Sequence, residues 1–318
     1  MQILMALRHA KGIDLPGPRS IDGLGRVAAM AALLVFAWPV LAPDAMVATD
    51  GPGDAAVTPA ATAGDGGQSV RLAREMQVGA YSGASYTQPS AVTVENPDRT
   101  VFEVDEINWI GRPFKAPIYY GLRVLSWGPS ARFGAMVDFT HAKAISQFSE
   151  EATFSGTRNG RPAASRAKVG DVFRHLEFSH GHNLLTLNGL ARLGTFFGRI
   201  QPYLGVGGGI ALPHTEVGFK GEKERTYEYQ FAGFAWQSLA GIEVRLGRVS
   251  LFFEYKFTFS PYAVPLSQTR IGWLLVTDLW RQFQAWLAGG PPPGGTLRTT
   301  LVTHHAVSGV LVRVGRPR

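Results

Sequence analysis

The sequence has no cysteine in its 318 residues, so disulfide bonds, thiolate metal sites and a cysteine nucleophile are excluded. Charge is also scarce, because Asp, Glu, Lys and Arg together make up only 17% of the chain. Glycine is abundant, with 38 residues, and aromatic residues reach 11%. This composition is unusual for a cytosolic enzyme and is typical of a β-rich membrane protein.

The net charge of +7 indicates an acidic partner, such as nucleic acid or an anionic lipid surface. No basic run with interleaved aromatic residues marks a nucleic-acid-binding module. A membrane surface is therefore the expected partner, and nucleic acid is not.

Basic residues precede an uncharged apolar stretch, Val27–Leu41, which predicts a secretory signal over residues 1–45. A single transmembrane anchor is the alternative, but the stretch is shorter than the roughly 20 residues that a spanning helix needs. Residues 46–70 are rich in Gly, Pro and Ala and predict a flexible linker. Residues 71–318 then form one predicted β-domain.

Alternation of apolar and polar side chains is clearest in Leu251–Phe259, where every second residue is apolar. In water such an apolar face must pack against another part of the protein, whereas in a membrane it can face the lipid directly. Seven further segments show related patterns: Ala73–Ser82, Ile118–Trp127, Ala131–Ala142, Asn183–Thr195, Pro202–Leu212, Gln230–Val244 and Thr300–Val314. Eight strands, an even number, can close on themselves and leave no exposed edge.

The connectors between these segments alternate strictly between short and long. The short ones are Gly128–Ser130, Phe197–Arg199 and Leu246–Arg248, and the long ones are Gly83–Ala116, Lys143–His180, Pro213–Tyr229 and Ser260–Leu297. This order is typical of short periplasmic turns and long outer loops. The sequence therefore predicts an all-β fold, an eight-stranded antiparallel transmembrane β-barrel of the outer membrane.

The last long connector contains Ile271–Leu287, whose apolar residues recur at helical spacing. We expect an amphipathic helix there, either on the membrane interface or as a lid over the barrel mouth. Alternation also predicts which polar side chains point inward. They include Glu254 and Lys256, which could pair with Asp138 and Arg123 in a polar interior.

Most histidines lie near strand ends or in the expected outer loops, so we expect several to converge at the outer rim. They are His141, His175, His180, His182, His214, His304 and His305. Glu177 and Glu216 lie two residues from His175 and His214, and a His/carboxylate set of this kind suits a divalent metal. The alternative is that each histidine is an ordinary rim residue.

Two stretches are more specific than the rest: Asp138–Lys143, DFTHAK, and Phe178–Asn188, FSHGHNLLTLN. The glycine-rich Pro202–Gly207 is weaker, because many small barrels have such a strand. Together with shorter pieces, these stretches make residues 74–314 resemble the bacterial outer-membrane lipid A oxidases.

The resemblance implies that the proximal glucosamine of lipid A is oxidised to 2-amino-2-deoxygluconate, with molecular oxygen as acceptor and hydrogen peroxide as co-product. It also implies that the 1-phosphate is removed first, since only a free anomeric hydroxyl leaves a hemiacetal that can be oxidised. Lipid A and outer-membrane lipids are the implied partners, and we expect a monomer. The resemblance carries over no catalytic residue.

Triplet oxygen reacts slowly with sugars, so a divalent or redox metal ion is the expected cofactor. No dinucleotide-binding fingerprint offers an organic alternative. The expected metal ligands are His141, His180, His182 and His214, and the expected catalytic residues are Asp138, His141, His180 and Glu216. Lys143 and Arg174 are expected to hold a lipid A phosphate.

Three other functions remain open. A non-catalytic barrel would only bind envelope components. A lipid A hydrolase or acyltransferase would need a Ser/His/acid arrangement, for which Ser179 beside His180 is a weak hint; adjacent residues of an extended strand face opposite sides. A soluble β-rich periplasmic protein is disfavoured by the apolar face of Leu251–Phe259.

Overall fold

The computed structural model describes residues 75–97, 100–266, 275–290 and 294–314. The predicted signal (residues 1–45) and linker (46–70) lie outside the described residues. The described chain is an antiparallel β-structure, as the sequence predicts.

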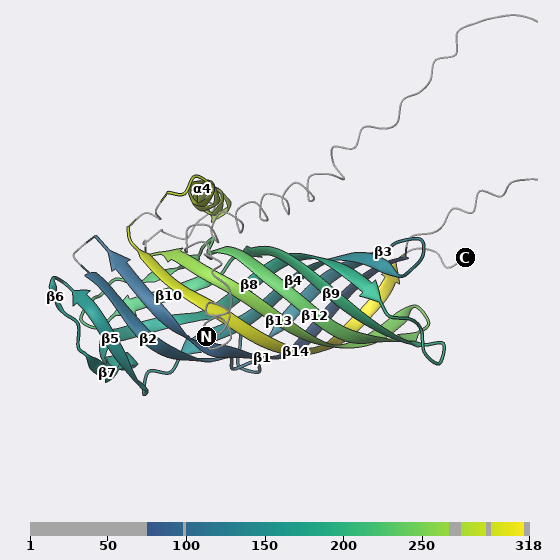
Figure 1. Ribbon diagram of the computed structural model, residues 1–318, viewed down its shortest axis with the longest axis horizontal. Coiled ribbons are helices and arrows are strands. Elements are labelled where there is room, and N and C mark those ends of the chain that lie inside the picture. Colours follow the sequence, from purple (N-terminus) through teal and green to yellow (C-terminus); the bar gives the residue numbers. More distant parts are fainter. Residues whose placement is uncertain (1–74, 98–99, 267–274, 291–293, 315–318) are drawn as a thin grey trace, which may run out of the picture.

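Eight strands pair in a closed ring, in the order β1–β3–β4–β8–β9–β12–β13–β14 and back to β1. Each of the eight predicted segments overlaps one of them, and every pairing is antiparallel. Their bounds are β1 Glu75–Asn96, β3 Tyr120–Trp127, β4 Phe133–Ser146, β8 Phe173–Arg192, β9 Ile200–Ala211, β12 Gly233–Leu246, β13 Val249–Pro265 and β14 Thr296–Val314. Figure 1 shows these strands inclined to the long axis of the molecule.

Short turns join the ring strands at one end. The tightest links β12 to β13 through Gly247 and Arg248, and Gly247 has a φ of 81°, which a residue without a side chain adopts most readily. All three predicted short connectors lie at this end. The strands at the other end continue beyond the ring, so the described residues of the four long connectors belong largely to strands and helices rather than to irregular loops.

Additional strands extend the wall at this second end (Figure 1, left). They and a short helix are β2 Thr100–Ile110, β5 Glu151–Arg158, β6 Arg161–Pro162, β7 Arg166–Lys168, α3 Val169–Val172, β10 His214–Phe219 and β11 Thr226–Tyr229. We call this part the extension. The alternation of apolar and polar residues does not predict the extension, because its segments lie in the long connectors, where the sequence predicts loops.

The ring and the extension have opposite polarity. The extension is filled by apolar side chains such as Phe102, Phe154 and Phe173, and its outward residues, such as Glu103 and Thr153, are polar. The ring instead exposes large apolar side chains on its outer surface: Met76, Val78, Leu122, Val124, Leu204, Val206, Ile242, Leu251, Phe253, Val310 and Val312. A polar interior inside an apolar wall is the reverse of a water-soluble protein.

The ring interior holds a buried ion-pair network. Arg123 contacts Glu254 at 2.8 Å and Asp138 at 3.2 Å, and Lys256 Nζ lies 2.9 Å from Asp138. The predicted pairing of these four inward residues is therefore confirmed. Every ion is paired and hydrogen-bonded, as buried charges require.

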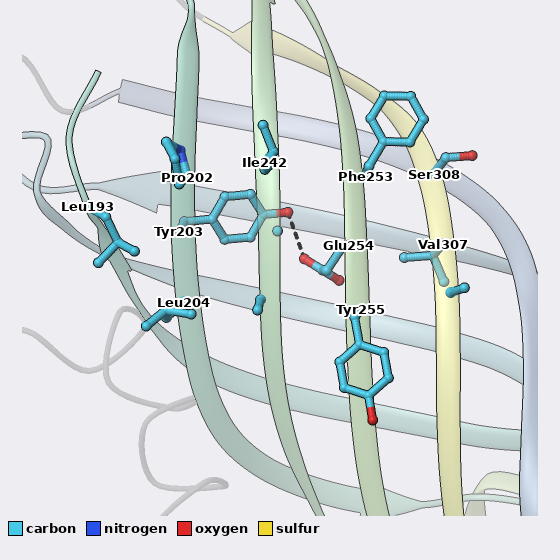
Figure 2. Close-up of a pocket in the computed structure, with 13 residues that line it drawn as sticks. Leu193, Pro202, Tyr203, Leu204, Ile242, Phe253, Glu254, Tyr255, Val307 and Ser308 are labelled. Carbon is cyan, nitrogen blue, oxygen red and sulfur yellow. Dashed lines mark hydrogen bonds between the residues drawn. The ribbon is translucent and has the colours of Figure 1, made fainter. Parts of the chain in front are cut away.

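A small residue in the wall lets this network extend. Gly241 has no side chain, and a Cβ there would lie 2.6 Å from the ring of Tyr203. The Tyr203 hydroxyl crosses this space and donates to Glu254 Oε2 at 2.7 Å (Figure 2).

The predicted helix is present as α4, Leu275–Leu287; residues 271–274 lie outside the described part. It lies beside the wall rather than across the mouth (Figure 1), with Phe283 and Trp286 packed edge-on against Phe231. Trp280 is exposed, which suits an interfacial helix more than a lid. Within the described residues, none of the helices combines the length and apolar character required to cross a membrane.

Candidate functional site

The candidate site lies on the outer surface of the wall, where β8, β10 and β11 meet just beyond the ring. The register pairs Glu216 with Glu177 and Gly218 with His175 across β8 and β10. It pairs His214 with Tyr229 and Glu216 with Tyr227 across β10 and β11. Side chains directly opposite on neighbouring strands share a face, so these groups project together.

Two carboxylates and two imidazoles form the centre of the site. His175 Nδ1 lies 3.5 Å from Glu177 Oε1 and 3.2 Å from Glu216 Oε1. His180 Nδ1 lies 4.0 Å from the other oxygen of Glu216. Glu216 is nearly buried, with 6% of its side chain exposed, whereas His180 is 46% exposed, so the site opens to the surroundings on the His180 side.

His214 adjoins this centre and is almost buried. Its ring lies 5.0 Å from that of His180 and is enclosed by Tyr227 and Tyr229 at 4.6 and 4.8 Å. Burial, with a smaller contribution from His180, lowers the pKa of His214 to about 4, so the imidazole is neutral at pH 7. Its Nδ1 has no hydrogen-bond partner within the described part of the chain.

His141 lies at the boundary between the ring and the extension. It stacks on Tyr120 at 4.8 Å, and its Nδ1 lies 2.7 Å from Asn183 Oδ1. It also interacts electrostatically with His180. The structure therefore brings together four of the predicted site residues: His141, His180, His214 and Glu216.

A basic group lies next to the site. Lys143 Nζ donates to the carbonyl oxygen of Lys115 at 2.5 Å. Burial lowers the pKa of Lys143, and the neighbouring charges of Lys115 and Arg112 lower it further, while Glu177 opposes them. Lys143 is thus close to two other cations and electrostatically coupled to the centre of the site.

Arg174, the other predicted phosphate ligand, is engaged by the chain itself. Its guanidinium donates to the carbonyl oxygens of Lys223 and Glu224 at 3.0 and 3.4 Å. These bonds hold the turn between β10 and β11, which positions Arg225 against Glu216.

Two predicted site residues lie elsewhere. Asp138 is fully buried inside the ring, bound to Arg123 and Lys256, so the predicted catalytic set does not assemble around it. His182 points into the extension, where its Nδ1 hydrogen-bonds the hydroxyl of buried Tyr262. His182 therefore does not join the other three predicted histidine ligands, because it lies on the opposite side of the wall from His180.

The serine and histidine considered for a hydrolase are closer than the sequence predicts. Ser179 Oγ lies 3.3 Å from His180 Nδ1. The expectation that they face opposite sides is wrong. Glu216 approaches that same Nδ1, however, and a relay needs the serine and the acid on different ring nitrogens.

Sequence reasoning missed several residues of the site. They are Tyr120, Tyr227, Tyr229 and Arg225. Tyr227 and Tyr229 alternate with Glu228 in TYEY, and this short pattern was the available signal, but it lay inside an expected loop. The antiparallel register of β10 and β11 is what brings them to His214.

No protein-family model matches the sequence, and no curated protein matches it either. Among solved structures, the chain is similar to the crystal structure of Neisserial surface protein A (NspA), with 9% identity and a TM-score of 0.30. The similarity covers 76% of this chain and 97% of that one. A likeness this distant assigns no function.

Proposed function

We propose that this protein is an outer-membrane β-barrel enzyme that oxidises lipid A lacking its 1-phosphate. The observation that carries the proposal is the position of the site, on the outer surface of the wall directly beyond the apolar ring. The oxidase chemistry itself rests on the resemblance of DFTHAK and FSHGHNLLTLN to lipid A oxidases.

The polarity of the molecule supports a membrane location. A wall that exposes residues such as Leu122, Val206 and Phe253 around a charged interior is stable in hydrocarbon and unstable in water. The mostly polar outer surface of the extension favours water around that part. The ring would then span the outer membrane, with the turn end in the periplasm.

The site faces outward at the level where lipid headgroups lie. Tyr120 and His141 mark the end of the apolar wall, and His180 and Glu216 lie beyond them on the same surface. A soluble ligand is more usually held in a concave pocket, whereas a lipid in the outer leaflet meets a site on the wall directly. This placement favours a lipid headgroup as the substrate.

The basic group supports an anionic headgroup. Lys143, Lys115 and Arg112 adjoin the centre of the site, and ammonium and guanidinium groups are the usual partners of phosphate. In this proposal they bind the phosphate that remains on the distal sugar, and so orient the free anomeric hydroxyl toward His180 and Glu216.

The reaction removes two electrons and two protons from the anomeric carbon and its hydroxyl, which oxygen accepts to form hydrogen peroxide. Water then opens the lactone to the acid. His180 is the imidazole of the site that is open to the surroundings, with 46% of its side chain exposed beside Glu216, so we assign it to accept the hydroxyl proton. The His/Glu donors also fit a divalent metal ion, which would supply a route to triplet oxygen.

The test is mass spectrometry of 1-dephosphorylated lipid A after incubation with the purified, folded protein in air and under anoxia. Oxygen-dependent gain of about 16 mass units is expected, because the oxidation and ring opening add one oxygen atom in total. Unchanged mass in both conditions would contradict the oxidase and favour a binding barrel. Loss of an acyl chain would contradict it in favour of a hydrolase.

A further inference from the structure

Two glutamates of the site lie directly opposite each other on neighbouring strands. Glu177 of β8 and Glu216 of β10 are registered partners and project from the same face. Like charges in this position destabilise a pair of strands unless a cation lies between them. The structure therefore needs positive charge at this point.

The two distances from His175 to the glutamates are close to those between ligands of one metal ion. His175 Nδ1 is 3.2 and 3.5 Å from the carboxylate oxygens of Glu216 and Glu177, and the three donor atoms all lie within 4.8 Å of one another. Two donors that are each about 2.1 Å from a metal ion are separated by about 3.0 to 3.4 Å. Within the described residues, this is the group of three His or acidic side chains whose donor atoms all lie within 4.8 Å of one another.

Arg225 already supplies positive charge next to Glu216, and a metal ion bound there would have to displace it. Its Nη1 lies 2.5 Å from Glu216 Oε1, the oxygen that also faces His175. The Arg225 side chain is 40% exposed, and its guanidinium lies 4.5 Å from the centre of the Tyr227 ring. It can therefore release Glu216 and remain on the tyrosine face by a cation–π contact.

From this geometry we infer that His175, Glu177 and Glu216 bind one divalent transition-metal ion, such as Mn²⁺, Fe²⁺, Co²⁺ or Zn²⁺, in place of Arg225. One imidazole nitrogen and two carboxylates suit this class of ion, whereas Ca²⁺ takes oxygen ligands. His180, 4.0 Å from Glu216, lies beside the ion on the open side, and the almost buried His214, with its unpartnered Nδ1, adjoins His180. The inference assigns the metal of the proposed oxidase to ligands other than the four predicted histidines.

The experiment measures metal binding without lipid A. The full chain, refolded in detergent micelles and stripped with a chelator, is titrated with Co²⁺ while its visible d–d absorption is followed, and Zn²⁺ is then added as a competitor. We expect saturable 1:1 binding. Glu177→Gln and Glu216→Gln should each weaken it on the order of a hundredfold, whereas Arg225→Gln should tighten it about fivefold by removing the competing ion pair.

Matched controls separate the site from general charge effects. Glu103→Gln removes an exposed carboxylate of β2 and should leave Co²⁺ affinity unchanged. Unfolding in urea with the chelator present checks the fold of Glu177→Gln, which should be at least as stable as the parent because the like-charge pair is gone.

Absence of Co²⁺ and Zn²⁺ binding to the parent, or binding to Glu177→Gln and Glu216→Gln that is as tight as binding to the parent, would overturn the inference. If only Glu177→Gln and Glu216→Gln lose metal binding, the inference is supported, with or without a change in lipid A mass. Metal binding at these residues without oxygen-dependent change in lipid A mass would retain the site and reject the proposed oxidase, so the two failures are distinguishable.

Discussion

Arg123 donates two parallel hydrogen bonds to Glu254 inside the ring, Nη1 to Oε2 at 3.0 Å and Nη2 to Oε1 at 2.8 Å. Both side chains are fully buried, and the guanidinium also lies 4.4 Å from the centre of the Phe252 ring. This pair joins β3 to β13 across the interior, so it fixes the separation of two strands that do not touch in the wall.

Removing one charge of this pair leaves the other buried without its partner. Glu254→Gln should lower the free energy of unfolding by about 3 kcal/mol, within the range for breaking a buried pair. The measurement is urea unfolding in micelles, with outward Phe253→Leu as a control that keeps the interior intact. A loss of less than about 1 kcal/mol would show that the network does not hold the ring together.

An arginine on the lipid-facing wall tests the proposed membrane location. Phe253→Arg should cost about 2 to 4 kcal/mol of folding free energy in lipid vesicles, because the charge would lie in hydrocarbon. Val101→Arg is the matched control: Val101 is 54% exposed and Phe253 is 59% exposed, but Val101 belongs to the extension. Equal effects of the two substitutions would contradict a membrane-spanning ring.

His182 predicts a pH dependence of stability. Burial lowers its pKa to about 3, with a smaller contribution from His141, so the folded state keeps it neutral while the unfolded state takes up a proton below about pH 6.5. Stability is therefore complete above that pH and falls as the pH is lowered. Between about pH 7.5 and about pH 4.5 the loss assignable to this group is about 2 to 3 kcal/mol.

The comparison with His182→Gln isolates that contribution, since every other titrating group is shared. Unfolding curves at both pH values should show a smaller pH-dependent loss in the variant. The same loss in both proteins would mean that His182 does not titrate on unfolding.

Two rim histidines should be essential for the proposed oxidation, because His180 adjoins the reacting hydroxyl and His214 packs against His180. His180→Ala and His214→Ala should each lower kcat by about a hundredfold or more. His304→Ala is the control, since His304 lies on β14 and bonds Tyr255 and Gln88 instead. Rates are read from the mass spectra; full activity in both site variants would remove the histidines from the reaction.

Lys143 should affect binding more than chemistry. Lys143→Met should raise KM about tenfold with kcat nearly unchanged, as loss of a charge-assisted phosphate contact implies. Lys168→Met removes an exposed lysine of β7 and should change neither value. A fall in kcat at constant KM would instead place Lys143 in the chemical step.

Alternation along single segments was sufficient to predict the ring. In β13, every second residue from Leu251 to Phe259 faces outward and the residues between them are buried, as the sequence predicts. The same two-residue period placed Arg123, Asp138, Glu254 and Lys256 inside, where they pair. Local sequence carries this information because strand periodicity depends only on the backbone.

The site depended on contacts that local periodicity does not encode. His175 and Glu177 form a cluster only together with Glu216, which the β8–β10 register places opposite Glu177. The irregular backbone at Gly181 makes the side chains of His180 and His182 point to opposite sides of the wall. Register and irregularity are set by how distant strands pack against the apolar core of the extension. The sequence alone thus determined a closed β-structure with charged residues inside and histidines near one end; only the tertiary structure decided which of those histidines share a face.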